Sequence, residues 1–287
     1  MVILTSGSSQ AHIKMYIGID LGGTKTESII LDNKGNELER IRKSTPKNYN
    51  GTLDIVCELV NYLEDKYKSK CSVGVGSPGA LSFENDCIKG GNSTWLNNRP
   101  LKKDLELRLN RNIFLENDAN CFALSESIDG AGKNDDVVFG VIIGTGVGGG
   151  LVINNKIING HNNITGEWGH NQMPLGSNDK WNRHDCYCGK KGCIETFLSG
   201  PGFSRHFYDM FKINLDAKII QDNANNGDEK SLEFISQYLD YLARGLSQVI
   251  NIVDPGAIVL GGGVSNMKQI YELSLIHISE PTRPSII

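Results

Sequence analysis

Hydrophobic and polar positions change their period in a regular order along the first half of the chain. Short apolar runs at residues 16–20 and 27–31 flank a Gly-Gly turn and predict a β-hairpin, and residues 37–43 predict a third strand. Apolar residues then recur every three or four positions from Leu53 to Tyr67, which predicts an amphipathic helix. The further expected elements are a strand at 73–75, a helix at 101–109, a strand at 113–115 and a helix at 119–128. Strands that alternate with helices after an opening meander are typical of an α/β layer fold.

The second half begins with the same pattern. A buried strand at 137–143, a glycine turn at 144–150 and a strand at 151–154 follow one another. A shift of 122 residues, the difference between 140 and 18, places Gly18 on Gly140 and Gly22 on Gly144. We interpret this as an internal duplication, in which each half offers one glycine turn to a shared cleft. The boundary is expected near residues 133–136, and the longest later helices at 197–211 and 232–253.

Composition limits the classes of function. The 287 residues include 29 Lys+Arg and 33 Asp+Glu, so the net charge is 29 − 33 = −4, and 39% are hydrophobic. This length allows two modest domains with real cores. The longest apolar runs are shorter than the roughly 20 residues of a membrane helix, and mild acidity gives no general attraction for phosphate backbones. We therefore expect no nucleic acid and no membrane as partner. The odd number of cysteines, seven, indicates a reducing, cytoplasmic setting.

Both ends differ from the body of the chain. Residues 1–14 lack the features of a signal peptide, and Met15 is the expected natural start. After a helix-like run at 266–272, residues 273–287 match the translation of a common sequencing adaptor. The expected organisation is an N-terminal extension at 1–14, an α/β domain at 15–133, a second α/β domain at 134–272 and an artefactual tail at 273–287.

The two glycine turns are candidate phosphate sites. Residues 144–149 satisfy the pattern G-x-G-x-x-G, but a strand follows where a dinucleotide fold needs a helix, and the sequence contains no Walker A motif. Exposed backbone N–H groups in such turns can cradle phosphate oxygens. Glycine also supplies ordinary tight turns. Two turns at duplicated positions, one of which carries Asp20, Thr24 and Lys25, favour phosphate binding.

Asn117 and Asp118 stand where a predicted strand gives way to a helix. Both residue types favour the N-cap of a helix, which is one interpretation. The other is catalytic, because a carboxylate at the carboxyl end of a strand faces the cleft of an α/β sheet and can accept a proton from a substrate hydroxyl. The residues alone do not favour one of these two interpretations over the other.

Three cysteines within eight residues, Cys186, Cys188 and Cys193, predict a metal site. Thiolates at this spacing, with glycines between them, can wrap Zn²⁺, which needs a fourth ligand for tetrahedral coordination. His170 and His184 both compete for that position. The other cysteines (Cys57, Cys71, Cys87 and Cys121) lie singly in apolar segments and are expected to be core residues.

The motifs together resemble the ROK family of sugar kinases and repressors, in unbroken order from about Met15 to Glu272. They are residues 20–25 (D-x-G-G-T-K), 117–120 (N-D-A-N), 144–150 (G-T-G-V-G-G-G), 166–170 (G-E-W-G-H) and 186–195 (C-x-C-G-x-x-G-C-x-E). Residues 92–97, Trp168 and Asn171 resemble the bacterial fructokinase, mannokinase-like branch, and N-acetylglucosamine kinases are similar nearly everywhere else. Family members continue past Gly261-Gly262-Gly263 with a further stretch and a final helix, which this sequence replaces.

The resemblance implies an actin-like (ribonuclease H-like) ATPase fold with two domains and with ATP, Mg²⁺ and a hexose between the halves. It implies sugar binding by Asn117, Asp118, Glu167, His170 and Glu195, with Asp118 as the base. It assigns structural zinc to His170, Cys186, Cys188 and Cys193. The residues implied at the nucleotide are Gly18, Asp20, Gly22, Gly23, Thr24, Lys25, Gly144, Thr145, Gly146, Val147, Gly148, Gly149, Gly150, Gly261 and Gly262, with Asp20 near Mg²⁺ and the last two near adenosine.

The expected function is therefore ATP-dependent phosphorylation of fructose, by a homodimer. The alternative within the kinases is N-acetylglucosamine kinase, whose pocket must admit an acetamido group. A sugar-responsive repressor is disfavoured, because fourteen residues before Met15 are too few for a helix-turn-helix domain.

Overall fold

The computed structural model describes residues 15–176, 179, 181–271 and 285–286. The expected extension at 1–14 and most of the expected tail at 273–287 lie outside these residues. The chain divides into two compact units: the first runs to Cys121 and includes Gly160–Ile164, and the second comprises Phe122–Asn159 and the chain from Thr165 onward. The division falls inside a helix, earlier than the expected boundary at 133–136. Each unit is described by itself.

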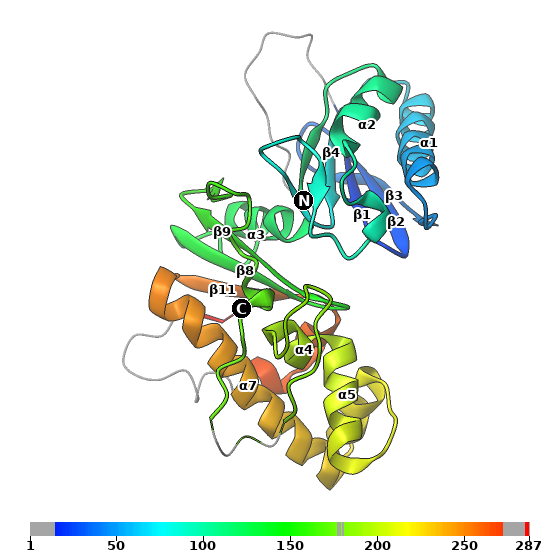
Figure 1. Ribbon diagram of the computed structural model, residues 1–287. Coiled ribbons are helices and arrows are strands. Elements are labelled where there is room, and N and C mark those ends of the chain that lie inside the picture. The colour runs from blue at the N-terminus through cyan, green and yellow to red at the C-terminus, as the bar shows by residue number, and fades with distance from the viewer. Residues whose placement is uncertain (1–14, 177–178, 180, 272–284, 287) are drawn as a thin grey trace. The chain divides into compact units, whose positions relative to one another are not determined.

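The first unit is built on a five-stranded sheet of order β3-β2-β1-β4-β7. Its strands are β1 (Tyr16–Leu21), β2 (Lys25–Leu31), β3 (Glu37–Ser44), β4 (Ser72–Ser77) and β7 (Phe114–Asn117). The strands β1, β2 and β3 form an antiparallel meander, whereas β1, β4 and β7 are parallel. The helices α1 (Tyr49–Tyr67) and α2 (Leu101–Leu109) pack against one another beside this sheet (Figure 1). Three short elements complete the unit: the paired strands β5 (Ala80–Leu81) and β6 (Ile88–Lys89), and the 3-10 turn η1 (Thr94–Leu96).

Helix α1 confirms the predicted helical period and shows why the helix begins before Leu53. The side chain of Asn48 accepts a hydrogen bond from the Gly51 backbone N–H at 2.8 Å, which satisfies one of the free donors of the first turn. The helix ends at Lys68 in the left-handed conformation, where the backbone N–H of Lys68 bonds the Glu64 carbonyl. The predicted stripe is buried: Leu53, Val56, Leu59, Val60 and Leu63 are each at most 2% exposed.

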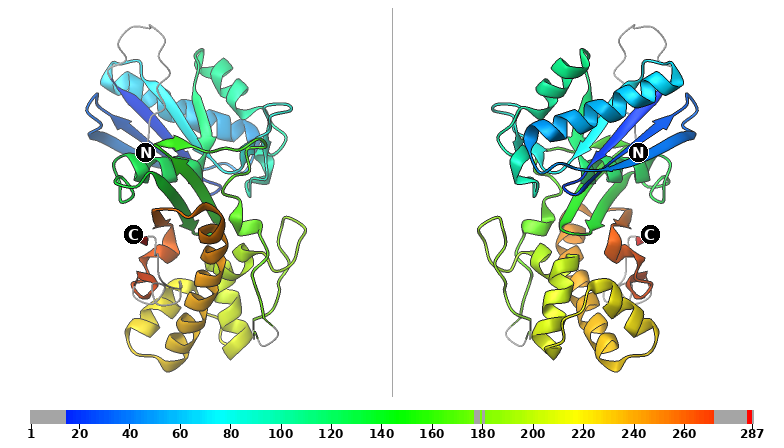
Figure 2. Two further views of the ribbon diagram at one scale, coloured as in Figure 1. Left: turned by 90° about the vertical axis from the view of Figure 1, so that its left-hand side faces the viewer. Right: turned by 90° about the vertical axis from the view of Figure 1, so that its right-hand side faces the viewer.

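The second unit repeats the same sheet plan, in the order β10-β9-β8-β11-β12. Its strands are β8 (Val137–Ile143), β9 (Val147–Ile153), β10 (Lys156–Ile157), β11 (Ala257–Gly261) and β12 (Ser285–Ile286). A layer of helices, α4 (Ile194–Leu198), α5 (Gly200–Phe211), α6 (Ala217–Asn225) and α7 (Glu229–Val253), packs together in this unit (Figure 2). The other elements are α3 (Asp118–Ile128), which leads into this unit, and the 3-10 turns η2 (Trp168–His170) and η3 (Gly263–Asn266).

The two sheets confirm the predicted duplication. Adding 122 to the bounds of β2 gives 147 and 153, the bounds of β9. In both units the first strand of the hairpin also pairs in parallel with a later strand. The hairpin registers differ by one residue, since Gly18 faces Ile29 whereas Gly140 faces Gly150. The α/β order predicted from the sequence is therefore observed in each unit.

Two predicted boundaries in the second unit were wrong. Strand β9 begins at Val147, so the last four residues of the expected glycine turn at 144–150 are strand, because pairing with β8 overrides the turn preference of glycine. The helix expected at 197–211 is broken at Ser199, whose extended backbone caps α5 through a bond from the Gly202 N–H. Pro201 follows at the start of α5, where its missing N–H is tolerated.

The long helix α7 is amphipathic and contributes much of the second core. Its buried side includes Phe234, Tyr238, Leu242 and Leu246, each fully enclosed. The Tyr238 hydroxyl donates to the Leu198 carbonyl at 2.8 Å, which satisfies the one polar atom of this side chain. Within the parts of the chain that the structure describes, no helix combines the length and apolarity that a membrane crossing needs.

A buried ion pair joins α1 to the chain that follows α2. The carboxylate of Glu64, 7% exposed, accepts two hydrogen bonds from the Arg111 guanidinium and one from the Cys71 backbone N–H at 2.8 Å. Burial raises the pKa of Glu64, but the bonds from Arg111 and Cys71 outweigh it and lower the pKa from 4.5 to about 2. The folded state therefore holds this carboxylate ionised more strongly than the unfolded chain does.

We expect Glu64→Gln to lower the free energy of unfolding by about 3 kcal/mol at pH 7, because it leaves the Arg111 charge without its partner. The wild-type contribution should be complete above pH 4.5 and be lost as the pH falls toward 2, so the difference between the two proteins should shrink over that range. Urea unfolding at a series of pH values measures it. Glu58→Gln is the control and should change little, because Glu58, also on α1, makes only an exposed pair with Lys43 of strand β3. If both variants lost the same free energy of unfolding, the Glu64–Arg111 pair would have no special role in stability.

Candidate functional site

The hairpin turn of the first unit is held in a tight geometry. The Gly22 N–H donates to the Lys25 carbonyl at 3.0 Å, and the Thr45 hydroxyl donates to the Gly22 carbonyl at 2.8 Å. A Cβ at Gly22 would stand 2.7 Å from the Lys25 carbonyl oxygen, so only glycine fits there without a shift. The side chains of Thr24 and Lys25 are exposed. The turn thus presents a hydroxyl and a cation at its surface, as an anion site requires.

The carboxyl ends of three parallel strands bring two predicted acids to one edge of the first sheet. Asp20 on β1 lies beside Gly76 on β4, and Gly76 lies beside Glu116 on β7. Asp118 follows two residues after Glu116. Both Asp20 and Asp118 are exposed at this edge, which is where ligands bind in parallel α/β sheets.

Asn117, rather than Asp118, caps helix α3. The Asn117 side-chain oxygen accepts from the N–H groups of Ala119 at 2.9 Å and Asn120 at 3.2 Å, while its amide nitrogen donates to the Gly79 carbonyl at 3.1 Å. Asp118 is the first residue of the helix, and its Oδ1 accepts from the Ala119 N–H at 2.8 Å. The structure therefore divides the two interpretations of this motif: Asn117 carries the cap, and Asp118 offers an exposed carboxylate beside a helix N-terminus.

The glycine turn of the second unit is packed against η2, α4 and the start of α5. The Gly144 N–H donates to the Gly146 carbonyl at 2.9 Å, and the Gly200 N–H donates to the Gly144 carbonyl at 2.8 Å. A Cβ at Gly149 would lie 2.8 Å from Trp168, and one at Gly146 would lie 2.7 Å from the Glu195 carboxylate. Close packing is thus one reason for these glycines, independent of any ligand.

Glu195 connects this turn to the cysteine cluster. It lies in the first turn of α4, and its Oε2 accepts from the Val147 N–H at 3.0 Å, while its Oε1 is 4.0 Å from the Cys186 sulfur. Burial raises the pKa of Glu195, and the bond from Val147 opposes that rise. Glu167 is exposed and precedes η2, the turn that ends in His170.

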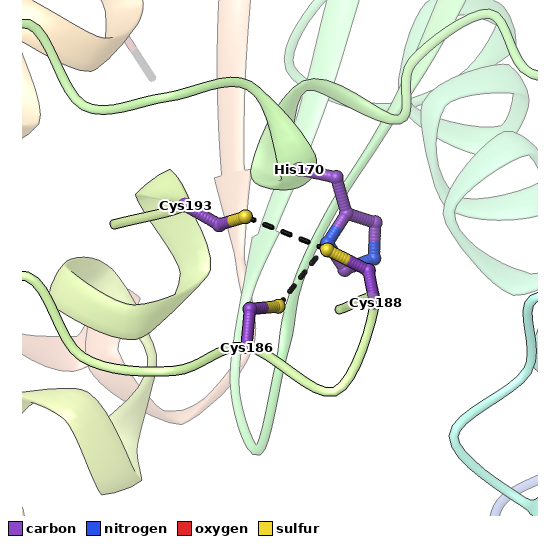
Figure 3. Close-up of side chains that lie close together, drawn as sticks. All are labelled: His170, Cys186, Cys188 and Cys193. Atoms are coloured by element: carbon purple, nitrogen blue, oxygen red, sulfur yellow. Dashed lines mark hydrogen bonds between the residues drawn. The ribbon is translucent and has the colours of Figure 1, made fainter. Parts of the chain in front are cut away.

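His170 and the three cysteines form a cluster, as Figure 3 shows. One ligand atom from each lies within 4.8 Å of every other. The His170 Nδ1 is 3.6 Å from the Cys186 sulfur, and the sulfurs of Cys188 and Cys193 are 3.5 Å apart. Burial and the contact with Cys188 raise the pKa of Cys193 to about 12, a cost that a bound cation would reverse. Three thiols and one imidazole in this spacing fit a tetrahedral Zn²⁺ site.

The two candidate histidines lie among different partners. His184 lies outside the cysteine cluster, and its Nε2 is 2.8 Å from the Asp209 carboxylate. His170 has its Nδ1 toward Cys186 and its Nε2 3.0 Å from the Tyr187 hydroxyl. Burial lowers the pKa of His170, which favours the neutral form that binds metal. This contact between Tyr187 and His170 is not predictable from the sequence, because a single tyrosine between two cysteines forms no recognisable motif.

The last predicted glycines end strand β11. Gly262 has a φ of 90°, and a Cβ there would lie 2.4 Å from the Ile143 carbonyl oxygen. Gly261 packs against the ring of Phe122. The predicted site residues therefore fall into two sets. The first unit holds Gly18, Asp20, Gly22, Gly23, Thr24, Lys25, Asn117 and Asp118, and the second holds Gly144–Gly150, Glu167, His170, the three cysteines, Glu195, Gly261 and Gly262.

Comparison with known proteins identifies relatives along almost the whole chain. The sequence matches the model of the ROK family over residues 16–280. It is 41% identical over 264 residues to an N-acetyl-D-glucosamine kinase of Shigella boydii, covering 89% of this chain and 86% of that protein. It is 39% identical to an N-acetyl-D-glucosamine kinase of Pectobacterium carotovorum, covering 90% and 87%.

Solved structures agree with this result. A ROK hexokinase from Thermus thermophilus superposes with a TM-score of 0.78 at 29% identity, covering 92% of this chain and 87% of that one. A ROK family glucokinase from Streptomyces griseus, solved with glucose and AMPPNP, superposes with a TM-score of 0.79 at 25% identity, covering 95% and 93%. These matches confirm the predicted actin-like α/β ATPase fold.

The cluster generates a spectroscopic prediction. We expect the full-length protein, stripped of metal and titrated with Co²⁺, to develop an intense thiolate-to-metal absorption band, because the cation would bind the cysteine sulfurs. Cys186→Ser should weaken or abolish that band. Cys87→Ser, which changes a cysteine far along the chain from the cluster, is the matched control and should keep it. An unchanged band in Cys186→Ser would remove this residue from the ligand set.

Proposed function

Because the chain belongs to the ROK family and is a sugar kinase of that family, we propose that it transfers the terminal phosphoryl group of ATP to N-acetyl-D-glucosamine. The choice of sugar rests on one observation: the chain is 41% identical, over 264 residues, to an N-acetyl-D-glucosamine kinase of Shigella boydii. Fructose was the leading expectation of the sequence analysis, and N-acetylglucosamine was its alternative. The relatives favour the alternative.

Asp118 is the proposed general base. It is exposed at the carboxyl edge of the first sheet, and Asn117 supplies the helix cap through two N–H groups of α3. In our proposal it accepts a hydrogen bond from the attacking sugar hydroxyl and takes its proton late. Phosphoryl transfer passes through a loose transition state, so aligning the nucleophile matters more than base strength.

The remaining polar residues are proposed to bind the sugar. Asn117 would act from the first unit, and Glu167, His170 and Glu195 from the second. In support, Glu195 and His170 are held in place by neighbouring backbone and side-chain groups rather than by solvent alone. Preorganised acceptors and donors lose less freedom on binding, which is how a site gains both affinity and orientation.

The glycine turns are proposed to hold the phosphates of ATP, through residues 18–25 and 144–151, with Asp20 near Mg²⁺ and with Gly261 and Gly262 near the adenosine. The support is local. Each turn closes on itself through one backbone bond, from Gly22 in one and from Gly144 in the other, and such turns present backbone N–H groups to an anion. Mg²⁺ would neutralise charge on the transferred group.

Zinc is proposed as a structural ion held by His170, Cys186, Cys188 and Cys193. Its chemistry there would be to neutralise the thiolates and to fix residues 186–193, the segment that carries the three cysteines and that we call the cysteine knuckle. With Nδ1 directed to the metal, His170 would be kept in one tautomer and would present Nε2 to a hydroxyl group. The ion takes no part in the transfer itself.

The choice of sugar can be tested by kinetics. We expect kcat/KM for N-acetyl-D-glucosamine to exceed that for fructose at least tenfold, because a pocket built to pair with an acetamido group leaves polar atoms unpaired when that group is missing. ADP release, measured with ATP, Mg²⁺ and each of fructose, mannose, glucose and N-acetyl-D-glucosamine, gives the ratio. A higher value for fructose would overturn the proposed substrate and restore the earlier expectation.

The role of Asp118 can be tested separately. Asp118→Asn should lower kcat by about 10² or more while the unfolding midpoint stays close to that of the wild type, because the base is lost and the cap on Asn117 remains. Asp65→Asn, at an exposed position on α1 in the same unit, is the matched control and should be fully active. Normal turnover in a folded Asp118→Asn protein would exclude this residue as the base.

A further inference from the structure

A second group of metal-ligating side chains lies apart from the cysteine cluster. His206 and Asp209 are three residues apart on α5 and therefore share one face of that helix. His184 reaches them from the segment before the cysteines. One ligand atom from each of these three residues lies within 4.8 Å of the other two.

His206 is buried without the partners that its ring needs. It is 1% exposed, and neither of its nitrogens makes a hydrogen bond of good geometry, although the backbone of Thr196 contributes a lesser interaction with the ring. Its ring stacks on Trp181, with centroids 4.3 Å apart, and on Phe197, at 4.8 Å. Stacking accounts for the faces of the ring but not for its edge, and a buried polar atom without a partner costs about 1–3 kcal/mol. The backbone of Thr196 can pair only with a ring N–H, so the lone pair of the other nitrogen is enclosed without a hydrogen-bond donor.

The nitrogens of His206 lie next to two polar side chains, His184 and Asp209, that are partly exposed to solvent. The side chains of His184 and Asp209 are 24% and 25% exposed, and His184 Nε2 is 2.8 Å from Asp209 Oδ2. Asn182 Nδ2 lies 3.5 Å from the same oxygen. The rings of His184 and His206 have centroids 5.0 Å apart and are inclined at 60°. An ion could therefore enter from the His184 and Asp209 side and reach the buried nitrogen.

We propose that His184, His206 and Asp209 form a second metal site, which takes a divalent first-row transition metal such as Zn²⁺. Two imidazoles and one carboxylate suit Zn²⁺, Co²⁺, Ni²⁺ or Cu²⁺, whereas Mg²⁺ and Ca²⁺ prefer oxygen ligands alone. Ligand atoms of a tetrahedral Zn²⁺ site lie about 3.3 Å from one another, given metal–ligand bonds of about 2.0–2.1 Å. Small side-chain rotations would bring the three atoms to that spacing, and water would complete the coordination.

The ionisation of the ligands agrees with this assignment. Burial, and then the neighbouring His184, lower the pKa of His206 to about 3, so its ring is neutral and able to donate a lone pair. Burial opposes ionisation of Asp209, but its contacts with His184 and Asn182 lower the pKa of this carboxyl overall. The site would combine two neutral ligands with one anion.

The second ion would tie helix α5 to the base of the cysteine knuckle. The His184 carbonyl accepts from the Gly192 N–H at 2.9 Å, so the backbone of His184 is already part of the knuckle, while its side chain reaches Asp209 on α5. Its role would be structural, and it does not depend on which sugar the protein phosphorylates.

The test is a Co²⁺ titration of the full-length, metal-free protein, followed by absorption and by calorimetry. We expect one bound equivalent that adds ligand-field absorption without a thiolate band. Asp209→Asn and His184→Ala should each weaken that equivalent at least tenfold and leave any thiolate band unchanged. Asp222→Asn, at an exposed position on α6, is the matched control and should retain it. Mg²⁺ in place of Co²⁺ should give no comparable binding.

The proposal fails if the wild-type protein binds no Co²⁺ equivalent lacking a thiolate band, which would make His206 a neutral stacked core residue. It also fails if such an equivalent survives both Asp209→Asn and His184→Ala with unchanged affinity. Because the two substitutions are at partly exposed positions, circular dichroism can confirm that each variant is folded. Where one variant is not folded, the wild-type spectrum and the other variant decide.

Discussion

The hydrogen bond from the Val147 N–H to the Glu195 carboxylate links the chemistry of the second unit to its fold. One partner begins strand β9, directly after the glycine turn, and the other lies two residues after Cys193, at the start of α4. A displacement of the knuckle would move Glu195 and with it the turn. A Cβ at Gly146 would stand 2.7 Å from the same carboxylate, so a larger residue there would press on this bond. If the second unit binds sugar and phosphate as proposed, the proposed zinc would act on that binding only by holding these groups in position.

The first unit meets a different constraint, because the free N–H groups of a helix start draw on the oxygens of a carboxylate placed there. The chain separates the two tasks between neighbours. Asn117 accepts from two N–H groups of α3 and donates to the Gly79 carbonyl, which fixes the strand end. Asp118 then remains exposed at the first position of helix α3. This arrangement is compatible with the role of general base that we propose for Asp118.

The sequence predicted those features that depend on local period and missed those that depend on packing. The buried stripe of the helix from Leu53 to Leu63 and the repeat of β2 in β9 could both be predicted. Each depends on the spacing of residues in the sequence itself. The start of β9 was missed, because glycine signals a turn and only pairing with β8 makes these residues a strand. The choice between His170 and His184 was likewise open, since both lie near the cysteines in sequence. The resemblance to the family favoured His170, and the fold agrees by directing His184 to Asp209 instead.

The same reasoning explains why the motifs identify a reaction more readily than a sugar. Asp118, Glu167, His170 and Glu195 are suited to hydroxyl groups, which fructose and N-acetyl-D-glucosamine both carry. Discrimination between them needs atoms that pair with the acetamido group or reject its absence, and a site of that kind can separate substrates strongly because unpaired buried polar groups are costly. Such atoms need not lie in any motif. The support for N-acetyl-D-glucosamine accordingly comes from identity distributed over 264 residues and not from any single motif.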